Sequence, residues 1–264
     1  MTARSRPAHY DPGDFARLRP VEDGHFWFVS RNNILGAVLA TLAGEVPRAG
    51  AVLEIGCGTG NTLRVLRDML PDSTLVGMDA LHAGLLHARD RTPASLVEGR
   101  LEEMPFRKQF VLVGMFDVLE HIEDDVTGLG LIHEVLQPSG ALMLTVPADP
   151  SLWSRCDEEW HHQRRYTEPQ LRKVLSEARF HVEYITHFMS VTYPALWLSR
   201  RLARLRGAMA ADPQPAAGVA TMQEVQVTGF LNKLFGLLLR VEVPVIRRRY
   251  RLPVGASLLA IARV

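Results

Sequence analysis

The stretch Val52-Leu53-Glu54-Ile55-Gly56-Cys57-Gly58-Thr59-Gly60 decides how this chain folds. A short apolar strand ends in an acid, and three glycines follow at alternate positions. Because glycine has no Cβ, backbone N–H groups and a helix N-terminus can approach a polar ligand closely there. Helical spacing begins with Leu63, Leu66 and Leu70, so the glycines lie on a turn from strand to helix. The pattern predicts a nucleotide-type ligand site.

The glycine spacing indicates which ligand this site takes. The dinucleotide fingerprint is Gly-x-Gly-x-x-Gly, whereas this chain reads Glu-x-Gly-x-Gly-x-Gly from Glu54 to Gly60. The stretch resembles motif I of the class I S-adenosylmethionine-dependent methyltransferases. On this stretch alone, the alternative is a tight turn in an unrelated α/β protein.

Composition limits the classes to which the protein can belong. With 264 residues, 47% hydrophobic and 22% charged, the chain can form one large α/β domain with an insertion, or two small domains. A formal net charge of +1 gives no argument for a nucleic-acid partner. Two cysteines, Cys57 and Cys156, fit neither a disulfide framework nor a metal cluster, so we expect no metal.

Two stretches bear on location. Residues 1–7 lack the apolar run of a signal peptide, so we expect a cytoplasmic protein. Residues 230–246 are strongly apolar but contain Lys233, Arg240 and Glu242, so we expect no membrane span there.

Strand and helix patterns alternate from residue 52 to residue 147, which is the signature of a doubly wound parallel sheet. The expected strands after the first are residues 74–78, 94–97, 110–116 and 141–147. Residues 180–185 alternate as a further strand, and residues 256–262 are apolar as a last one. The resemblance implies an α/β fold with a seven-stranded, mostly parallel Rossmann-like sheet whose last strand is antiparallel.

The expected domain organisation has four parts. Residues 1–45 form an N-terminal arm, loose up to residue 20, and a helical cover; residues 46–187 form the methyltransferase core; residues 188–254 form a helical insertion; and residues 255–264 form the last strand. The rings of residues 25–28 precede the helix of the cover. That helix either packs against the domain or covers the cofactor, with Arg31 reaching the methionine carboxylate.

An acid at the end of the second strand is placed to bind a ribose. Asp79 lies roughly 20 residues beyond the glycine loop, and its two oxygens can accept both ribose hydroxyls; Ala80 and Leu81 then lie near the adenine. After the third strand the family usually reads Gly-Asp-Ala-x-x-Leu-Pro-Phe, with the Asp receiving the adenine amino group. Arg100 stands at that position and has no acceptor, so the amino group must bond to Glu102 or a backbone carbonyl.

The end of the fourth strand, Asp117-Val118-Leu119-Glu120-His121, again resembles the family. Ligands of open α/β sheets lie outside the carboxyl ends of the strands, which puts residues 115–117 beside the ligand. His121 either fixes the turn or acts as a base. The resemblance implies a cofactor site made of Arg31, Glu54, Gly56, Cys57, Gly58, Gly60, Asp79, Ala80, Leu81, Arg100, Leu101, Glu102, Met115, Phe116 and Asp117.

The loop after the fifth strand, residues 151–167, is expected to hold the acceptor. It resembles a family subset with a His five places after an Asp, followed by x-Arg-Arg-Tyr-Thr, and the match makes His162 that histidine. His162 either takes the proton from an acceptor hydroxyl or orders the loop. The arginines either bind an anionic acceptor or pair with Asp157, Glu158 or Glu159, and His161 occupies a position often held by glycine. The expected substrate contacts are Trp153, His161, Arg164, Arg165 and Tyr166.

The insertion carries two amphipathic helical patterns, at residues 197–205 and 230–239, with a flexible linker expected at residues 210–218. From residue 188 to 264 there are eleven basic residues against three acids. This composition indicates either contact with a membrane surface or a lipid-linked acceptor, or a helical lid or dimer surface.

Together these features predict a methyltransferase that uses S-adenosyl-L-methionine and releases S-adenosyl-L-homocysteine. We expect O-methylation of a small-molecule, glycan or lipid-linked acceptor by direct displacement, with His162 as the base. The alternatives are methylation of a carboxylate or phosphate without a base, and a non-catalytic S-adenosylmethionine-binding regulator. The glycine spacing disfavours a nicotinamide oxidoreductase, and the lack of an Asn-Pro-Pro-Tyr-type motif disfavours a nucleic-acid methyltransferase.

Overall fold

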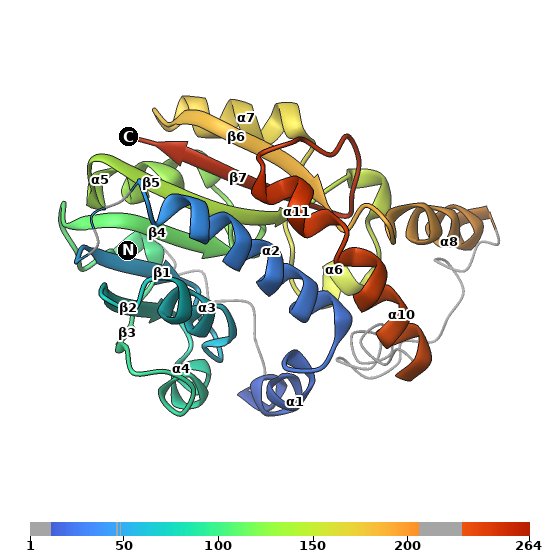
Figure 1. The fold of residues 1–264 in the computed structure, drawn as a ribbon, viewed down its shortest axis with the longest axis horizontal. Coiled ribbons are helices and arrows are strands. Elements are labelled where there is room, and N and C mark those ends of the chain that lie inside the picture. The colour runs from blue at the N-terminus through green and yellow to red at the C-terminus, as the bar shows by residue number, and fades with distance from the viewer. Residues whose placement is uncertain (1–11, 46, 48, 206–228) are drawn as a thin grey trace, which may run out of the picture.

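The computed structural model describes residues 12–45, 47, 49–205 and 229–264. Within these ranges the strands are β1 (Ala51–Ile55), β2 (Thr74–Asp79), β3 (Ser95–Glu98), β4 (Phe110–Phe116), β5 (Leu136–Pro147), β6 (His181–Phe188) and β7 (Ser257–Arg263). They form one sheet in the order β3-β2-β1-β4-β5-β7-β6 (Figure 1). The pairs among β1 to β5 are parallel, and β7 is antiparallel to both β5 and β6. The predicted fold class is confirmed.

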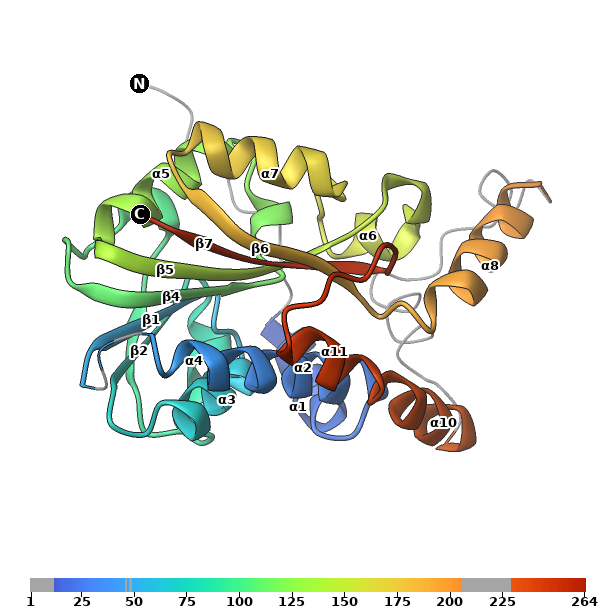
Figure 2. The ribbon, with the colours of Figure 1, turned by 45° about the horizontal axis from the view of Figure 1, so that its top comes forward.

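Helices cover both faces of this sheet. The α-helices are α1 (Pro12–Glu22), α2 (Phe26–Leu42), α3 (Asn61–Met69), α4 (His82–Arg89), α5 (Asp125–Val135), α6 (Arg155–Glu159), α7 (Glu168–Glu177), α8 (Tyr193–Leu205), α10 (Gly229–Leu239) and α11 (Glu242–Arg247). Three short 3₁₀ helices are η1 (Leu101–Glu103), η2 (Leu119–His121) and η3 (Pro150–Leu152). Figure 2 shows α5 and α7 on one face of the sheet and α2, α3 and α11 on the other.

The two faces bury separate hydrophobic clusters. One cluster joins Leu39 of α2 and Leu66 of α3 to Leu112 of β4. The other joins Ile132 of α5 and Leu171 of α7 to the opposite side of the sheet. Every residue of β4 is buried, as expected for a central parallel strand that is covered on both sides.

The N-terminal segment differs from the prediction of a loose arm over residues 1–20. Residues 12–22 form α1, while residues 1–11 lie outside the described residues. Phe15 is buried, and the Glu22 carboxylate accepts a hydrogen bond from the Thr59 hydroxyl and pairs with Arg91 at 2.7 Å. Pro12 suits the first position of a helix, and these tertiary contacts hold α1 over the glycine loop.

The insertion packs onto the N-terminal cover. Helices α8 and α10 coincide with the two predicted amphipathic patterns, α11 was not predicted, and the expected linker at residues 210–218 lies outside the described ranges. The Asn232 side chain of α10 accepts a hydrogen bond from Phe26 N at 2.7 Å and donates one to Gly24 O at 2.8 Å. The rings of Phe26 and Phe235 lie 5.3 Å apart. Helix α10 therefore satisfies the first backbone donor of α2.

A buried carboxylate anchors the insertion at the end of β6. The Glu242 side chain accepts hydrogen bonds from the backbone N–H groups of Met189, Ser190 and Val191 at 2.9, 2.7 and 3.1 Å. Burial raises its pKa, and the three N–H groups oppose that shift. In the described ranges, no helix combines the length and the apolar character that a membrane crossing requires.

Replacing Glu242 by alanine is expected to lower the free energy of unfolding by roughly 2–4 kcal/mol, because three backbone donors lose their acceptor. Urea denaturation followed by circular dichroism measures the change. Glu177→Ala is the matched control, since Glu177 is 49% exposed and pairs with Lys173 on the surface of α7, where a change within about 0.5 kcal/mol is expected. Equal losses in the two variants would contradict the anchoring role.

Candidate cofactor and acceptor site

The glycine loop between β1 and α3 has a backbone that side chains rarely tolerate. Gly56, Gly58 and Gly60 have φ angles of 70°, 48° and 78°. A Cβ at Gly56 would come within 2.3 Å of the Val118 side chain, and one at Gly60 within 3.0 Å of the Ala88 backbone. The loop therefore requires glycine for both conformation and space, and it places the N-terminus of α3, where Asn61 and Thr62 are buried, at the carboxyl edge of the sheet.

Asp79, at the end of β2, shapes this loop. Its Oδ2 accepts a hydrogen bond from Gly58 N at 2.7 Å, and its Oδ1 accepts one from Leu81 N at 2.8 Å. Burial raises the pKa of Asp79, and the backbone N–H groups oppose the shift. Each carboxylate oxygen can accept a second hydrogen bond, so the ribose role stays a prediction that this geometry permits.

Arg31 of α2 reaches the same edge. Its guanidinium donates to Asp117 Oδ2 at 2.7 Å and to Asn61 Oδ1 at 3.2 Å, and it lies over the Trp27 ring with its Cζ 4.9 Å from the ring centroid. Asp117, at the end of β4, also accepts a hydrogen bond from the Thr145 hydroxyl of β5 at 3.1 Å. The cover, the glycine-loop helix and the ends of two strands therefore meet at Arg31.

Buried polar atoms without hydrogen-bond partners gather around this meeting point. Among the described residues they include Arg31 Nε, Asn61 Nδ2, Glu54 Oε2 and both carboxylate oxygens of Glu120. Burial raises the pKa of Glu54 to about 8, although the Thr62 hydroxyl donates to its other oxygen. Because buried polar groups are normally paired, these unpaired donors and acceptors fit a polar ligand that offers both kinds of group.

Other predicted cofactor residues point elsewhere. The Cys57 thiol is buried against Gly77, and the side chains of Met115 and Phe116 lie in the core, so these three residues can offer a ligand only backbone atoms. The Arg100 guanidinium is exposed with its Nε 3.4 Å from Glu102. Leu101 is buried, while Ala80 and Leu81 lie near the surface at the end of β2.

The acceptor loop is organised by one buried carboxylate. Asp157 Oδ1 lies 2.8 Å from His162 Nδ1 and accepts a hydrogen bond from Arg165 Nε at 2.8 Å, while Oδ2 accepts one from Ser154 N. Burial acts to raise the pKa of Asp157, but its contacts with His162 and Arg165 outweigh burial and lower the pKa to about 2. Asp157 is therefore ionised at neutral pH and fixes the orientation of the His162 ring.

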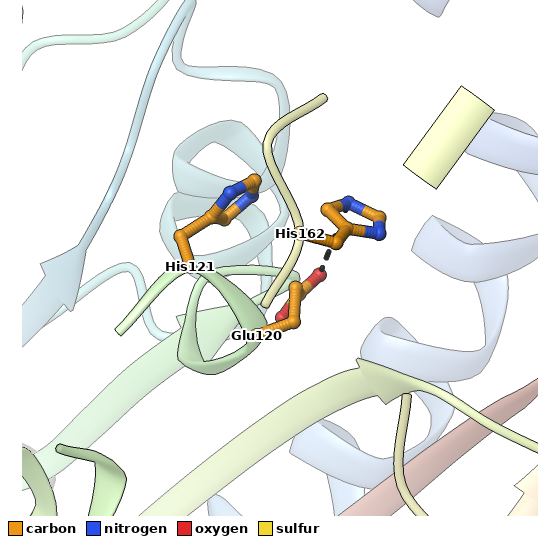
Figure 3. Close-up of side chains that lie close together, drawn as sticks. All are labelled: Glu120, His121 and His162. Carbon is orange, nitrogen blue, oxygen red and sulfur yellow. Dashed lines mark ion pairs between the residues drawn. The ribbon is translucent and has the colours of Figure 1, made fainter. Parts of the chain in front are cut away.

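Beyond the ring of His162 lie two residues of η2 (Figure 3). The Glu120 side chain is 1% exposed, and its Oε1 is 4.0 Å from His162 Nε2. The rings of His121 and His162 are 4.9 Å apart and nearly perpendicular. Burial raises the pKa of Glu120 well above its usual range, and burial together with His162 lowers that of His121 to about 4. Sequence analysis missed Glu120, because the motif that contains it gives no sign of what it faces.

The structure gives Arg164 and Tyr166 internal partners, and their substrate contacts stay predictions. Arg164 donates to Asp125 Oδ2 and to the Glu123 carbonyl, both at 2.7 Å. The Tyr166 hydroxyl donates to Asp125 at 2.8 Å, and the tyrosine is 2% exposed. For Arg165 the structure favours the alternative of pairing with Asp157. These side chains hold the loop against α5.

His161 and Trp153 lie on the outer side of this loop. His161 is exposed and has a φ of 57°, which explains why glycine suits its position. Trp153 is partly exposed, with its Nε1 3.5 Å from Glu158. Substrate contacts through these two residues stay predictions.

A family model described as a methyltransferase domain matches residues 27–185. A probable S-adenosylmethionine-dependent methyltransferase of Mycolicibacterium smegmatis is 27% identical over 163 residues, covering 60% of this chain and 61% of the relative. This chain belongs to the class I S-adenosylmethionine-dependent methyltransferases. Membership of the His-x-Arg-Arg-Tyr-Thr subset stays a prediction.

Further comparisons agree on the fold. The trans-aconitate 2-methyltransferase of Afipia carboxidovorans is 27% identical over 160 residues, covering 59% of this chain and 60% of the relative. This chain thus spans about 60% of the length of either relative. A chain from the Haloferax volcanii complex of the Trm112 methyltransferase activator with a methyltransferase superposes with a TM-score of 0.60 at 18% identity, covering 97% of this chain and 99% of that one. At this identity the likeness concerns the fold alone.

The described edge fits the cofactor of this family. The carboxylate oxygens of Asp79 can each accept a further hydrogen bond from a ribose, and Arg31, although paired with Asp117, keeps an unpaired Nε that can donate to a carboxylate. The unpaired atoms of Glu54 and Asn61 can bond polar groups of a ligand. The individual contacts of these residues stay predictions.

Asp79→Ala is expected to weaken S-adenosylmethionine binding tenfold or more, because a hydrogen bond to a charged group contributes about 1.5–3 kcal/mol. Isothermal titration calorimetry measures the affinity, and a thermal melt reports whether the variant remains folded. Asp72→Ala, at an exposed turn before β2, is the control and should bind as the wild type does. Unchanged affinity in a folded Asp79→Ala protein would remove Asp79 from the cofactor site.

Proposed function

We propose that the protein transfers a methyl group from S-adenosylmethionine to an oxygen atom of a small-molecule, glycan or lipid-linked acceptor. The bound cofactor supplies an electrophilic methyl group on a sulfonium, which an acceptor oxygen attacks in line with the departing sulfur. The observation that carries this proposal is the pair formed by His162 and Asp157. The pair lies at the same carboxyl edge of the sheet as the glycine loop and Arg31.

The pairing assigns a role to each nitrogen of His162. In our proposal the His162 ring is neutral and carries its one N–H proton on Nδ1, which donates a hydrogen bond to Oδ1 of the ionised Asp157. Nε2 then keeps its lone pair. That nitrogen faces Glu120 on the inner side of the loop, and the side chain is 16% exposed. In our proposal Nε2 accepts the proton of an acceptor hydroxyl as its oxygen attacks the methyl carbon.

The remaining residues would position the cofactor rather than take part in proton transfer. Arg31 would hold the methionine carboxylate, and Asp79 would hold the ribose. The ion pair between Arg31 and Asp117 places the cation next to the end of β4, so the cofactor's charged end would lie within the buried part of the site. Positioning of this kind can supply a large share of the rate enhancement.

Two alternative functions do not require His162 to act as a base. A carboxylate or phosphate acceptor is already ionised at neutral pH and needs no base, and one relative is named for the carboxylate trans-aconitate. A regulator that binds the cofactor without turnover also needs no base. Arg164 and Arg165 already have carboxylate partners, which favours a neutral hydroxyl over an anionic acceptor at this loop.

His162→Ala is expected to lower kcat roughly 10²–10⁴-fold, because that is the usual contribution of a positioned general base, and to leave cofactor affinity within about twofold. Transfer of a labelled methyl group to hydroxylated compounds from cell extracts gives the assay, and calorimetry gives the affinity. His181→Ala, at an exposed histidine at the start of β6, is the control. A His162→Ala protein as fast as wild type would leave the carboxylate acceptor as the better account.

We also propose that α8 and α10 contact an anionic lipid surface. Both helices lie beyond the carboxyl end of the sheet (Figures 1 and 2). Apolar side chains along them stay exposed, most of all Phe230 at 76% and Leu237 at 61%. The two helices and the residue after α10 carry the basic residues Arg200, Arg201, Arg204, Lys233 and Arg240. Exposed apolar area beside positive charge is the combination that favours anionic bilayers, and it supports a lipid-linked acceptor.

The double variant Phe230→Asp/Leu237→Asp is expected to reduce binding to vesicles of phosphatidylcholine with phosphatidylglycerol at least tenfold, because each apolar side chain contributes about 1.5–3 kcal/mol when buried. Co-sedimentation measures binding, and pure phosphatidylcholine vesicles test the need for negative charge. Leu86→Asp, on α4 at 48% exposure, is the matched control. Equal binding by all variants would exclude the lipid contact, and a monomer–dimer difference in light scattering would assign this face to self-association.

A further inference from the structure

Glu120, His121 and His162 bring three potential metal ligands together on the acceptor side of the sheet. One donor atom from each lies within 4.8 Å of the others. Figure 3 shows the Glu120 carboxylate directed at the His162 ring, with His121 alongside. Two ligands come from η2, just after β4, and the third comes from the loop after α6. Sequence spacing gave no hint of this grouping, since 41 positions separate His121 from His162.

A second, independent feature points to a ligand at this place. The Glu120 side chain is 1% exposed, and none of the other described residues gives either of its carboxylate oxygens a hydrogen bond. Buried acceptors are normally paired, and a carboxylate is a good ligand for a cation. A cation between Glu120 and the two imidazoles would give these oxygens a partner that the other described residues do not provide.

The outer contacts of both histidines are those of metal-bound imidazoles. His162 uses Nδ1 for Asp157 at 2.8 Å, which leaves Nε2 directed inward at Glu120. The His121 ring hydrogen-bonds the backbone of His161. In metal sites a ligating histidine usually gives its second nitrogen to a carboxylate or a backbone carbonyl, which fixes the tautomer and the ring orientation.

We propose that Glu120, His121 and His162 bind a divalent transition-metal cation of the zinc type, with open coordination positions facing the acceptor. Two imidazoles and one carboxylate suit Zn²⁺ and similar ions. Bonds of about 2.1 Å would place tetrahedral donors about 3.4 Å apart, and Nε2 of His162 is 4.0 Å from Glu120 Oε1. Since all three donor atoms lie within 4.8 Å of one another, binding requires each pair to approach by at most about 1.4 Å, which side-chain rotation can supply.

The consequence for the reaction, unlike the metal site itself, rests on the proposed function. An oxygen of the acceptor would occupy an open position on the cation, beside the cofactor edge marked by Asp117. The lone pair of His162 Nε2 would then be used for coordination. In the metal-bound protein the cation would lower the pKa of the coordinated hydroxyl, whose proton would leave to solvent water before the oxygen attacks the methyl carbon. His162 would act as the base only in the metal-free protein.

Metal binding tests the site without requiring turnover. The full-length protein is stripped of metal with a chelator, dialysed and titrated with Zn²⁺ in a calorimeter. In a second experiment the protein is loaded with Co²⁺, and its visible absorption is measured to test for a site of low coordination number. We expect about one ion per chain. Glu120→Gln and His162→Ala should each weaken binding at least tenfold, and Asp157→Asn roughly 10–100-fold through the orientation of His162.

The control distinguishes Zn²⁺ binding at Glu120, His121 and His162 from binding that uses the exposed His161. His161→Gly removes the exposed neighbouring imidazole at a position whose φ of 57° suits glycine, and it should leave Zn²⁺ affinity within about twofold. Absence of stoichiometric binding and of Co²⁺ absorption in the wild type would overturn the proposal, as would binding that survives Glu120→Gln or depends on His161. Cofactor affinity of the metal-free protein, measured in parallel, reports on the methyltransferase function separately.

Discussion

The left-handed turn between β1 and α3 is the constraint on which the rest of the site depends. Side chains at Gly56 and Gly60 would collide with Val118 and Ala88, so the helix can follow the strand this closely only with glycine there. Asp79 then fixes the loop by accepting from Gly58 N. The same turn places the helix N-terminus at the carboxyl edge of the sheet, and helix N-termini are favourable places for anionic groups.

Around this turn, ion pairs and hydrogen bonds of buried charged side chains hold loops that lack regular secondary structure. Arg31 joins the N-terminal cover to β4 and α3, Asp157 orders the acceptor loop, and Asp125 receives both Arg164 and Tyr166. These three charges are paired, as the cost of an isolated buried charge requires. Glu120 differs, because no other described residue gives its carboxylate oxygens a hydrogen bond, and our metal proposal starts from this difference.

The insertion and the cover form one unit although they are far apart in the sequence. Asn232 completes the N-terminus of α2, and Glu242 holds three backbone donors at the end of β6. These contacts fix α10 and α11 against the domain while leaving apolar side chains of α8 and α10 exposed. An insertion anchored at one side and exposed on the other is the arrangement from which we propose the lipid contact.

Periodicity and local chemistry were sufficient to determine the sheet, because strand and helix patterns depend on neighbouring residues and a glycine turn needs only its own spacing. They also placed Asp79 and Asp117 at the carboxyl edge, since that edge follows from parallel strands, whereas the role of Arg31 and the antiparallel last strand were expected from the resemblance to the family. The partners of Arg164, the helix over residues 12–22 and the meeting of Glu120 with His162 were decided by tertiary structure. Such contacts join residues tens of positions apart, and a local sequence pattern does not indicate which distant side chain a residue contacts in the folded protein.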